Sequence, residues 1–238
     1  MKMMIVGASR GLGRALVEGL GKPGDEVIGV SRRRPEHLPL APGVELGWIE
    51  ADLANPSVAV AQIEAGAPAA LDVLVCNVGI WEEHAFSEHY DFLGDSDESI
   101  SRLVEVNITA TLLLLKRLVP RLLASARPQL ILIGSTSALR QSGRPEVAFG
   151  ASKFALNGMA DALREGFRGQ RLAVTVLHPG YLNTDDPLST PLAAAAARGE
   201  GQLVPVHDVV TMVDALLRLS AASFVRELTL PAIGDERF

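Results

Sequence analysis

Three glycines near the N-terminus have the spacing of a phosphate-binding turn. Gly7, Gly11 and Gly13 lie between an apolar run at 3–8 and a helical pattern at 11–20. Glycine permits a tight turn and a close approach of the backbone to a pyrophosphate, and the N-terminus of a helix offers unpaired N–H groups and a partial positive charge. The sequence therefore predicts a turn that binds the pyrophosphate of a dinucleotide.

Basic residues follow the second apolar run, where the adenosine ribose of such a dinucleotide would lie. Arg32, Arg33 and Arg34 come directly after the run at 26–31, and the first carboxylate after them is Glu36. NAD favours an acidic residue at this place, whereas the 2′-phosphate of NADP requires positive charge, and the planar guanidinium suits phosphate oxygens. The other interpretation is a solvated surface turn. We predict NADP(H), with the 2′-phosphate bound by Arg10, Ser31, Arg32 and Arg33.

Apolar runs and helical patterns alternate along the whole chain, as in a parallel sheet with crossover helices. The runs are rich in Val, Ile and Leu at their centres, which is typical of strands covered on both faces. Strands are predicted at 3–8, 26–31, 44–52, 71–79, 128–137, 172–180 and 226–233, and helices at 11–20, 56–66, 97–124, 149–168 and 207–221. The predicted fold class is α/β, a Rossmann-type, doubly wound and mostly seven-stranded parallel sheet with helices on both faces.

Length and composition are those of one globular domain. The 238 residues are 48% hydrophobic and 21% charged, so the chain should bury a full core as a single domain over 1–238. The segment 181–206 combines three prolines with five consecutive alanines, and we expect a substrate-side insertion there that contains a short helix.

Charge and cysteine content exclude several function classes. A net charge of −6 gives no general reason to bind nucleic acid or an acidic membrane surface. No apolar run approaches the length of a membrane helix, and the N-terminus lacks the features of a signal peptide. Cys76 is the only cysteine, so we expect a reducing compartment, the cytoplasm. No metal site is predicted.

The spacing G-x-x-x-G-x-G resembles the T-G-x-x-x-G-x-G pattern of the short-chain dehydrogenase/reductase family. Val6 stands where that family usually has threonine, which softens the turn but removes no phosphate donor. The resemblance extends over nearly the whole chain. Asp52-Leu53 matches the place of an aspartate that contacts adenine, Cys76-Asn77-Val78-Gly79 resembles N-N-A-G beside the ribose, and Pro179-Gly180 with Thr184 resembles the P-G-x-x-x-T segment along the nicotinamide.

The resemblance and the residue chemistry together define the expected cofactor site. It consists of Gly7, Ser9, Arg10, Gly11, Leu12, Gly13, Ser31, Arg32, Arg33, Asp52, Leu53, Asn77, Gly79, Lys153, Pro179, Gly180 and Thr184.

The resemblance also implies a catalytic group, with one departure. The family motif Y-x-x-x-K is occupied by Phe149-Gly150-Ala151-Ser152-Lys153, so the lysine is present and the tyrosine is absent. Asn107 matches the asparagine that organises a proton-relay water. Two residues could be the family's serine. Thr136 has the usual spacing of 13 residues to position 149, whereas Ser135 matches the local sequence I-G-S, and we favour Ser135.

Phenylalanine fills the volume of tyrosine but has no proton to give or take, and four explanations follow. Another acid could replace it, with His84, His89, Tyr90 and Tyr181 as candidates, or the reaction could be reduction of a C=C bond. The chain could be a non-catalytic NADP(H)-binding regulator or scaffold, or Phe149 could be a deliberate replacement of tyrosine. A spacing of seven residues, known from enoyl reductases, would put the tyrosine at Glu146 and is not supported.

Trp81, Phe86 and Tyr90 cluster after the C-N-V-G segment, and these rings either line a pocket for an apolar or aromatic carbonyl compound or pack in the core. The apolar helices at 97–124 and 149–168 resemble those through which the family forms homodimers and homotetramers.

The predicted function is an NADP(H)-dependent oxidoreductase of the carbonyl reductase or alcohol dehydrogenase type, with an atypical or inactivated catalytic centre.

Overall fold

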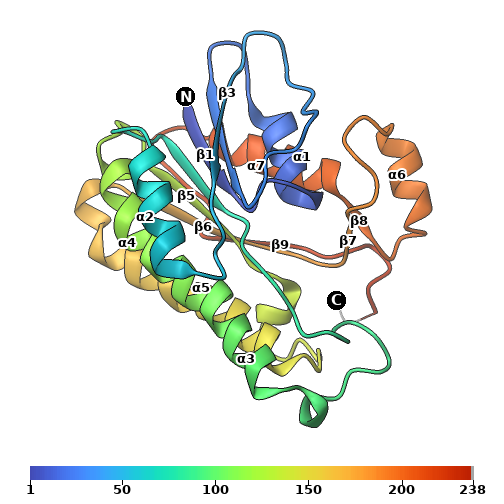
Figure 1. The fold of residues 1–238 in the computed structure, drawn as a ribbon. Helices are drawn as coiled ribbons and strands as arrows, with labels where there is room; N and C mark the ends of the chain where they lie inside the picture. Colours follow the sequence, from blue (N-terminus) through green and yellow to red (C-terminus); the bar gives the residue numbers. More distant parts are fainter. Residues whose placement is uncertain (237–238) are drawn as a thin grey trace.

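The computed structural model describes residues 1–236, and its centre is a parallel sheet with helices on both faces (Figure 1). All neighbouring strands of this seven-stranded sheet are parallel. Their order across the sheet is β3 (Glu45–Glu50), β2 (Glu26–Ser31), β1 (Lys2–Val6), β4 (Val73–Cys76), β5 (Gln129–Ile133), β6 (Ala173–Pro179) and β9 (Glu227–Leu230). The predicted fold class is therefore confirmed.

Helices cover the two faces of the sheet in separate groups. One face carries α1 (Gly11–Leu20) and α7 (Val206–Leu217), and the other carries α2 (Pro56–Gly66), α4 (Ala110–Leu123) and α5 (Val147–Gly166) (Figure 1). Single 3₁₀ turns occupy Phe92–Gly94, Thr136–Ala138 and Arg168–Gln170. Within residues 1–236, no helix combines the length and the apolar character that crossing a bilayer would require.

Strand β1 shows why the strand centres are apolar throughout. Successive strand side chains point to opposite faces of a sheet. Met4 and Val6 accordingly pack under α2, α4 and α5, whereas Met3 and Ile5 pack under α1 and α7, and all four are completely buried. A strand covered on both faces has no solvent-facing side.

The predicted helix 97–124 is divided in the structure. It consists of α3 (Asp97–Val104), a π-helical turn at Glu105–Thr109 and α4. The turn contains Asn107, whose side chain bonds to a distant segment, so a tertiary contact that hydrophobic periodicity does not report stabilises the irregular turn. The segment 181–206 contains the expected short helix, α6 (Leu192–Arg198), and a small sheet of β7 (Leu182–Asn183) and β8 (Val204–Pro205) that was not predicted.

The chain order of the strands fixes where a ligand can bind. From β1 the chain builds outward through β2 and β3, then returns to place β4 on the other side of β1. The connections that follow β1 and β4 therefore diverge, which leaves a crevice at the carboxyl ends of these strands. Gly7 follows β1 and Asn77 follows β4, so both predicted site residues lie at this crevice.

Candidate active site

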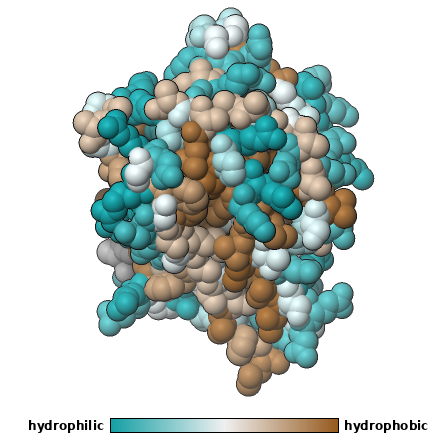
Figure 2. All heavy atoms as spheres, turned by 90° about the vertical axis from the view of Figure 1, so that its left-hand side faces the viewer, coloured by the Kyte–Doolittle hydropathy of each residue, from teal (hydrophilic) through white to brown (hydrophobic). Residues whose placement is uncertain are grey.

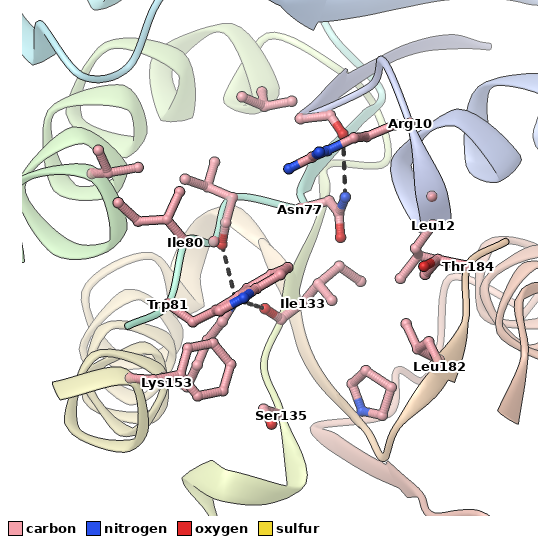
Figure 3. Close-up of a pocket in the computed structure, with 18 of the residues that line it drawn as sticks. Arg10, Leu12, Asn77, Ile80, Trp81, Ile133, Ser135, Lys153, Leu182 and Thr184 are labelled. Atoms are coloured by element: carbon pink, nitrogen blue, oxygen red, sulfur yellow. Dashed lines mark hydrogen bonds between the residues drawn. The ribbon is translucent and has the colours of Figure 1, made fainter. Parts of the chain in front are cut away.

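A cavity of about 770 Å³ opens at this crevice, a volume suited to a sizeable ligand. In Figure 3, Arg10, Leu12 and Thr184 lie at one end and Trp81, Lys153 and Ser135 at the other. Three predicted site residues do not line this cavity: Gly13, Arg33 and Asn107. The other predicted residues all line the cavity: Gly7, Ser9, Arg10, Gly11, Leu12, Ser31, Arg32, Asp52, Leu53, Asn77, Gly79, Ser135, Thr136, Phe149, Lys153, Pro179, Gly180 and Thr184.

The glycine turn after β1 leaves no room for larger residues. Gly7 has φ +85, and a Cβ there would overlap the carbonyl oxygen of Asn77. A Cβ on Gly13 would overlap the carbonyl oxygen of Gly7, so Gly13 acts by close packing below the cavity. The amide of Asn77 donates to that same Gly7 oxygen at 3.2 Å. These contacts fix the turn that faces the cavity.

The N-terminus of α1 is free to bind an anion. The first N–H groups of a helix have no intrahelical partner, and here no side chain caps them and no acidic residue stands in the first turn. Gly11 and Leu12 of this turn line the cavity, and Thr184 lies 3.3 Å from where a Cβ of Gly11 would be. Backbone donors and a helix N-terminus facing a glycine-bordered cavity fit the pyrophosphate of a nicotinamide dinucleotide.

Two arginines line the cavity near the carboxyl ends of β1 and β2. Arg10 and Arg32 are exposed, line the cavity and have no ion-pair partner among the residues that the structure describes. Arg33 is exposed outside the lining. The hydroxyl of Ser31 donates to the carbonyl oxygen of Arg33 at 2.8 Å, so its hydrogen is used within the turn. The positive charge available to a phosphate therefore comes from Arg10 and Arg32.

Lys153 and Phe149 lie one turn apart on α5 and face the other end of the cavity. The ammonium of Lys153 donates to the carbonyl oxygens of Val78 (2.9 Å) and Ile133 (3.0 Å), and its Nζ is 5.8 Å from the centre of the Phe149 ring. Burial lowers the pKa of Lys153 to about 8, since desolvation disfavours the charged form. The lysine remains mostly protonated at pH 7, with one N–H left for a ligand.

The turn after β5 brings Ser135 and Thr136, the two candidates for the family's serine, to the cavity. Ser135 is half-buried, and its Oγ accepts a hydrogen bond from the N–H of Ser137 at 3.1 Å, so its own O–H is free to donate. Thr136 also lines the cavity but is almost fully buried. Burial lowers the pKa of His178, and the neutral ring places Nδ1 3.1 Å from the carbonyl oxygen of Ser135, where it braces the turn.

Asn107 lies beneath the cavity and joins two elements. Its Oδ1 accepts from the N–H of Ile80 at 2.9 Å, and its Nδ2 donates to the Ile80 carbonyl oxygen (2.8 Å) and to Ser152 Oγ (2.9 Å). The side chain thereby ties the segment after β4 to α5, which carries Phe149 and Lys153.

Of the four candidates for a replacement acid, only Tyr181 lines the cavity. His84 and His89 are exposed elsewhere, and the Tyr90 hydroxyl accepts a hydrogen bond from the N–H of Val147 at 2.9 Å. The Tyr181 oxygen accepts from Arg144 Nη1 at 3.0 Å.

Two buried glutamates that we did not predict hold the N-terminus of α5. Glu82 is completely buried, and its Oε1 accepts from the N–H groups of Ala148 and Phe149, both at 3.0 Å. In the reverse direction, Glu146 Oε1 accepts from the N–H of Phe86 at 2.9 Å. The segment after β4 therefore caps the helix on which position 149 stands. The partners lie more than 50 residues apart in sequence, so no local pattern marks them.

Replacing Glu82 with alanine should lower the free energy of unfolding by about 1–3 kcal/mol, because two buried N–H groups lose their acceptor. Urea denaturation at pH 7 measures this. Glu82→Gln keeps an acceptor oxygen and should lose less, and Glu83→Ala, at an exposed neighbour, is the control. An equal loss in Glu82→Ala and Glu83→Ala would show that the cap adds nothing.

The chain belongs to the short-chain dehydrogenase family, which matches residues 2–190. It is 30% identical over 230 residues to 1-deoxy-11-beta-hydroxypentalenate dehydrogenase of Streptomyces exfoliatus, a match that covers 88% of this chain and 77% of that protein. It is 29% identical over 205 residues to the NADPH-dependent pterin aldehyde reductase of Arabidopsis thaliana, covering 77% and 75%.

The fold is also found among solved structures. The alcohol dehydrogenase of the archaeon Thermococcus sibiricus, complexed with 5-hydroxy-NADP, has a TM-score of 0.77 at 19% identity, with 98% of this chain and 96% of that chain covered. Members of the family are oxidoreductases that use nicotinamide cofactors on small-molecule substrates, and the chain is an oxidoreductase of this family.

Proposed function

We propose that the protein is an NADP(H)-dependent oxidoreductase acting on a carbonyl/hydroxyl pair, with Phe149 at the position of the usual proton donor. The observation that carries this proposal is one cavity lined by the glycine turn, the free N-terminus of α1 and the ammonium of Lys153. The nicotinamide supplies or accepts the hydride. Activity with NADPH and a panel of carbonyl compounds tests the proposal, and its absence in both the native chain and Phe149→Tyr would contradict it.

Each lining group has a role in this proposal. Lys153 holds the ribose hydroxyls beside the nicotinamide, and its charge keeps this end of the cavity positive. Ser135, whose O–H is free, binds the substrate oxygen, with Thr136 as the other candidate. Asn107 holds the backbone of Ile80 and in this way supports the proton relay. Pro179, Gly180 and Thr184 border the nicotinamide.

The preference for NADP(H) rests on Arg10 and Arg32. Replacing either with alanine should weaken NADPH binding by about 1.5–3 kcal/mol, roughly tenfold to more than a hundredfold, because each loses a charged hydrogen bond to the 2′-phosphate. NADH lacks that phosphate, so its affinity should change little. Titration of both coenzymes by fluorescence measures the effect, with Arg34→Ala, exposed outside the cavity, as the control. Equal losses for NADPH and NADH would contradict the assignment.

We also propose a homodimer or homotetramer that associates through α4 and α5. Figure 2 shows the side of the molecule on which these helices lie, where hydrophobic side chains gather between polar ones. Leu112 on α4 and Phe154 on α5 are 48% and 45% exposed, so both side chains are available to a second copy of the chain. Light scattering at micromolar concentration tests this, and a monomer would contradict it.

A further inference from the structure

We propose that this site reduces planar, quinone-type dicarbonyl compounds, a substrate class that rests on the NADP(H)-dependent function proposed above. Three features meet in the cavity: a wall of aromatic rings, fixed positive charge and a phenylalanine where a proton donor would stand. The first selects flat conjugated molecules. The other two favour a reduction that leaves a stabilised anion.

The aromatic wall consists of Trp81, Phe86, Phe149 and Tyr181, which all line the cavity. Phe86 is its centre: the ring centroids lie 5.1 Å from Phe149, 5.9 Å from Trp81 and 5.7 Å from Tyr181. All three contacts are edge-to-face, so the rings support one another without stacking flat. Trp81 remains 53% exposed and offers area to a ligand. A wall of this kind favours a planar conjugated ring over a flexible or bulky aliphatic chain.

The missing hydroxyl at position 149 affects saturated ketones and quinones differently. Hydride transfer to a saturated ketone forms a C–H bond and leaves an alkoxide, a strong base that needs a proton as it forms. Hydride transfer from C4 of NADPH to one quinone oxygen breaks the C4–H bond and forms an O–H bond, and the electron pair leaves NADP⁺ and a hydroquinone monoanion. That charge is delocalised over the aromatic ring, and water supplies the second proton afterwards. Loss of the acid therefore slows ketone reduction much more than quinone reduction.

Positive charge near the wall can stabilise the anionic product. Lys153 lies beside Phe149, with Nζ 5.8 Å from the ring centre, and Arg144 lies over the Tyr181 ring, with Cζ 4.4 Å from its centre. Arg144 also donates to the Tyr181 oxygen at 3.0 Å and forms an ion pair with Asp235 at 2.7 Å, which fixes the guanidinium at the cavity but balances its charge. The net positive charge beside the wall therefore comes from Lys153. A preorganised cation of this kind stabilises developing negative charge without reorganisation.

Tyr181 is the remaining rival as a proton donor, because it is the only phenol in the lining of the cavity. If it protonated the substrate oxygen, the site would be a ketone reductase with a relocated acid. The Tyr181→Phe variant keeps the ring of the aromatic wall and removes only the hydroxyl. We expect it to lose less than about tenfold in quinone reduction, whereas loss of a general acid typically removes roughly 10²–10⁴-fold.

The test compares 2-methyl-1,4-naphthoquinone with 1-tetralone, a bicyclic ketone of similar size that has one carbonyl on a saturated ring. NADPH oxidation is followed with protein-free blanks, and NADPH deuterated at C4 shows by a rate decrease that hydride transfer occurs at the site. We expect kcat/KM for the quinone to exceed that for the ketone by roughly 100-fold or more in the native chain, the lower end of the effect of a general acid. In Phe149→Tyr the ketone should gain at least as much and the quinone less than about tenfold.

Each outcome separates this inference from the function on which it rests. Reduction of both compounds at similar rates by the native chain overturns the quinone assignment, as does a hundredfold loss of quinone reduction in Tyr181→Phe. NADPH binding without quinone reduction, with ketone reduction by Phe149→Tyr, overturns the assignment and leaves the NADP(H) function standing. Failure to bind NADPH overturns both.

Discussion

Replacing Phe149 with tyrosine is expected to raise kcat/KM for the monoketone 1-tetralone by roughly 10²–10⁴-fold, the usual contribution of general acid–base catalysis. The ring already lies at the cavity, one helical turn from Lys153, and the capped N-terminus of α5 holds its backbone. The ammonium near the ring would stabilise the phenolate form and so lower the pKa of an added phenol. The variant therefore supplies the one group that the site lacks.

Steady-state rates with NADPH and 1-tetralone measure this gain. Phe224→Tyr, which adds the same oxygen at an exposed position outside the cavity, is the matched control and should leave the rate unchanged. An unchanged ketone rate in Phe149→Tyr, with NADPH still bound, would show that position 149 does not face the substrate oxygen.

Replacing Lys153 with methionine should abolish turnover and change how stability depends on pH. The lysine has a pKa of about 8 in the folded chain against an ordinary value of 10.5. Below pH 8, where the lysine is protonated in both the folded and the unfolded chain, this difference destabilises the fold by about 3 kcal/mol. Between pH 8 and 10.5 the folded state has released its proton and the unfolded state has not. The unfolded state then binds more protons, so stability should rise with pH across this window.

The measurable quantity is the free energy of unfolding of the native chain minus that of Lys153→Met, at pH 7, 8.5 and 10. Cys76 contributes in the opposite direction: burial raises the pKa of its thiol to about 12, so above the ordinary value of 9.0 it lowers the stability of the fold. Both proteins contain Cys76, so the difference between them removes this contribution. Loss of the bonds to Val78 and Ile133 adds only a pH-independent offset. A difference that stays constant from pH 7 to 10 would contradict a lowered lysine pKa.

Much of the fold follows from local sequence signals. Helices α1 and α2 begin and end at the predicted residues, 11–20 and 56–66, because a glycine turn opens the first and Pro56 stands at the first position of the second. Strand β2 has the predicted bounds, 26–31, and β1 begins one residue before its predicted start and ends two residues before its predicted end. The other five strands of the large sheet lie within the predicted runs with shorter bounds, since only the sheet-paired centre of each run is a strand. The two-residue strands β7 and β8 are too short for any periodicity.

The site could be predicted where its chemistry depends on consecutive residues. The turn at Gly7, Gly11 and Gly13 needs a fixed spacing, and that spacing is visible in the chain. The roles of Glu82 and Glu146 depend on bonds between residues that are far apart in sequence, and isolated glutamates carry no signal of burial. The same holds for Arg144, whose partners Tyr181 and Asp235 become neighbours only in the folded chain.

Binding of the two coenzymes to the purified chain shows whether the cavity at the glycine turn holds a nicotinamide dinucleotide. Trp81 lines the cavity, so bound NADPH should quench tryptophan emission and gain emission of its own by energy transfer. We expect saturable binding of NADPH and weaker binding of NADH, by roughly tenfold or more, from the loss of one or more charged bonds to the 2′-phosphate. Saturation by neither coenzyme would contradict a dinucleotide site at the glycine turn.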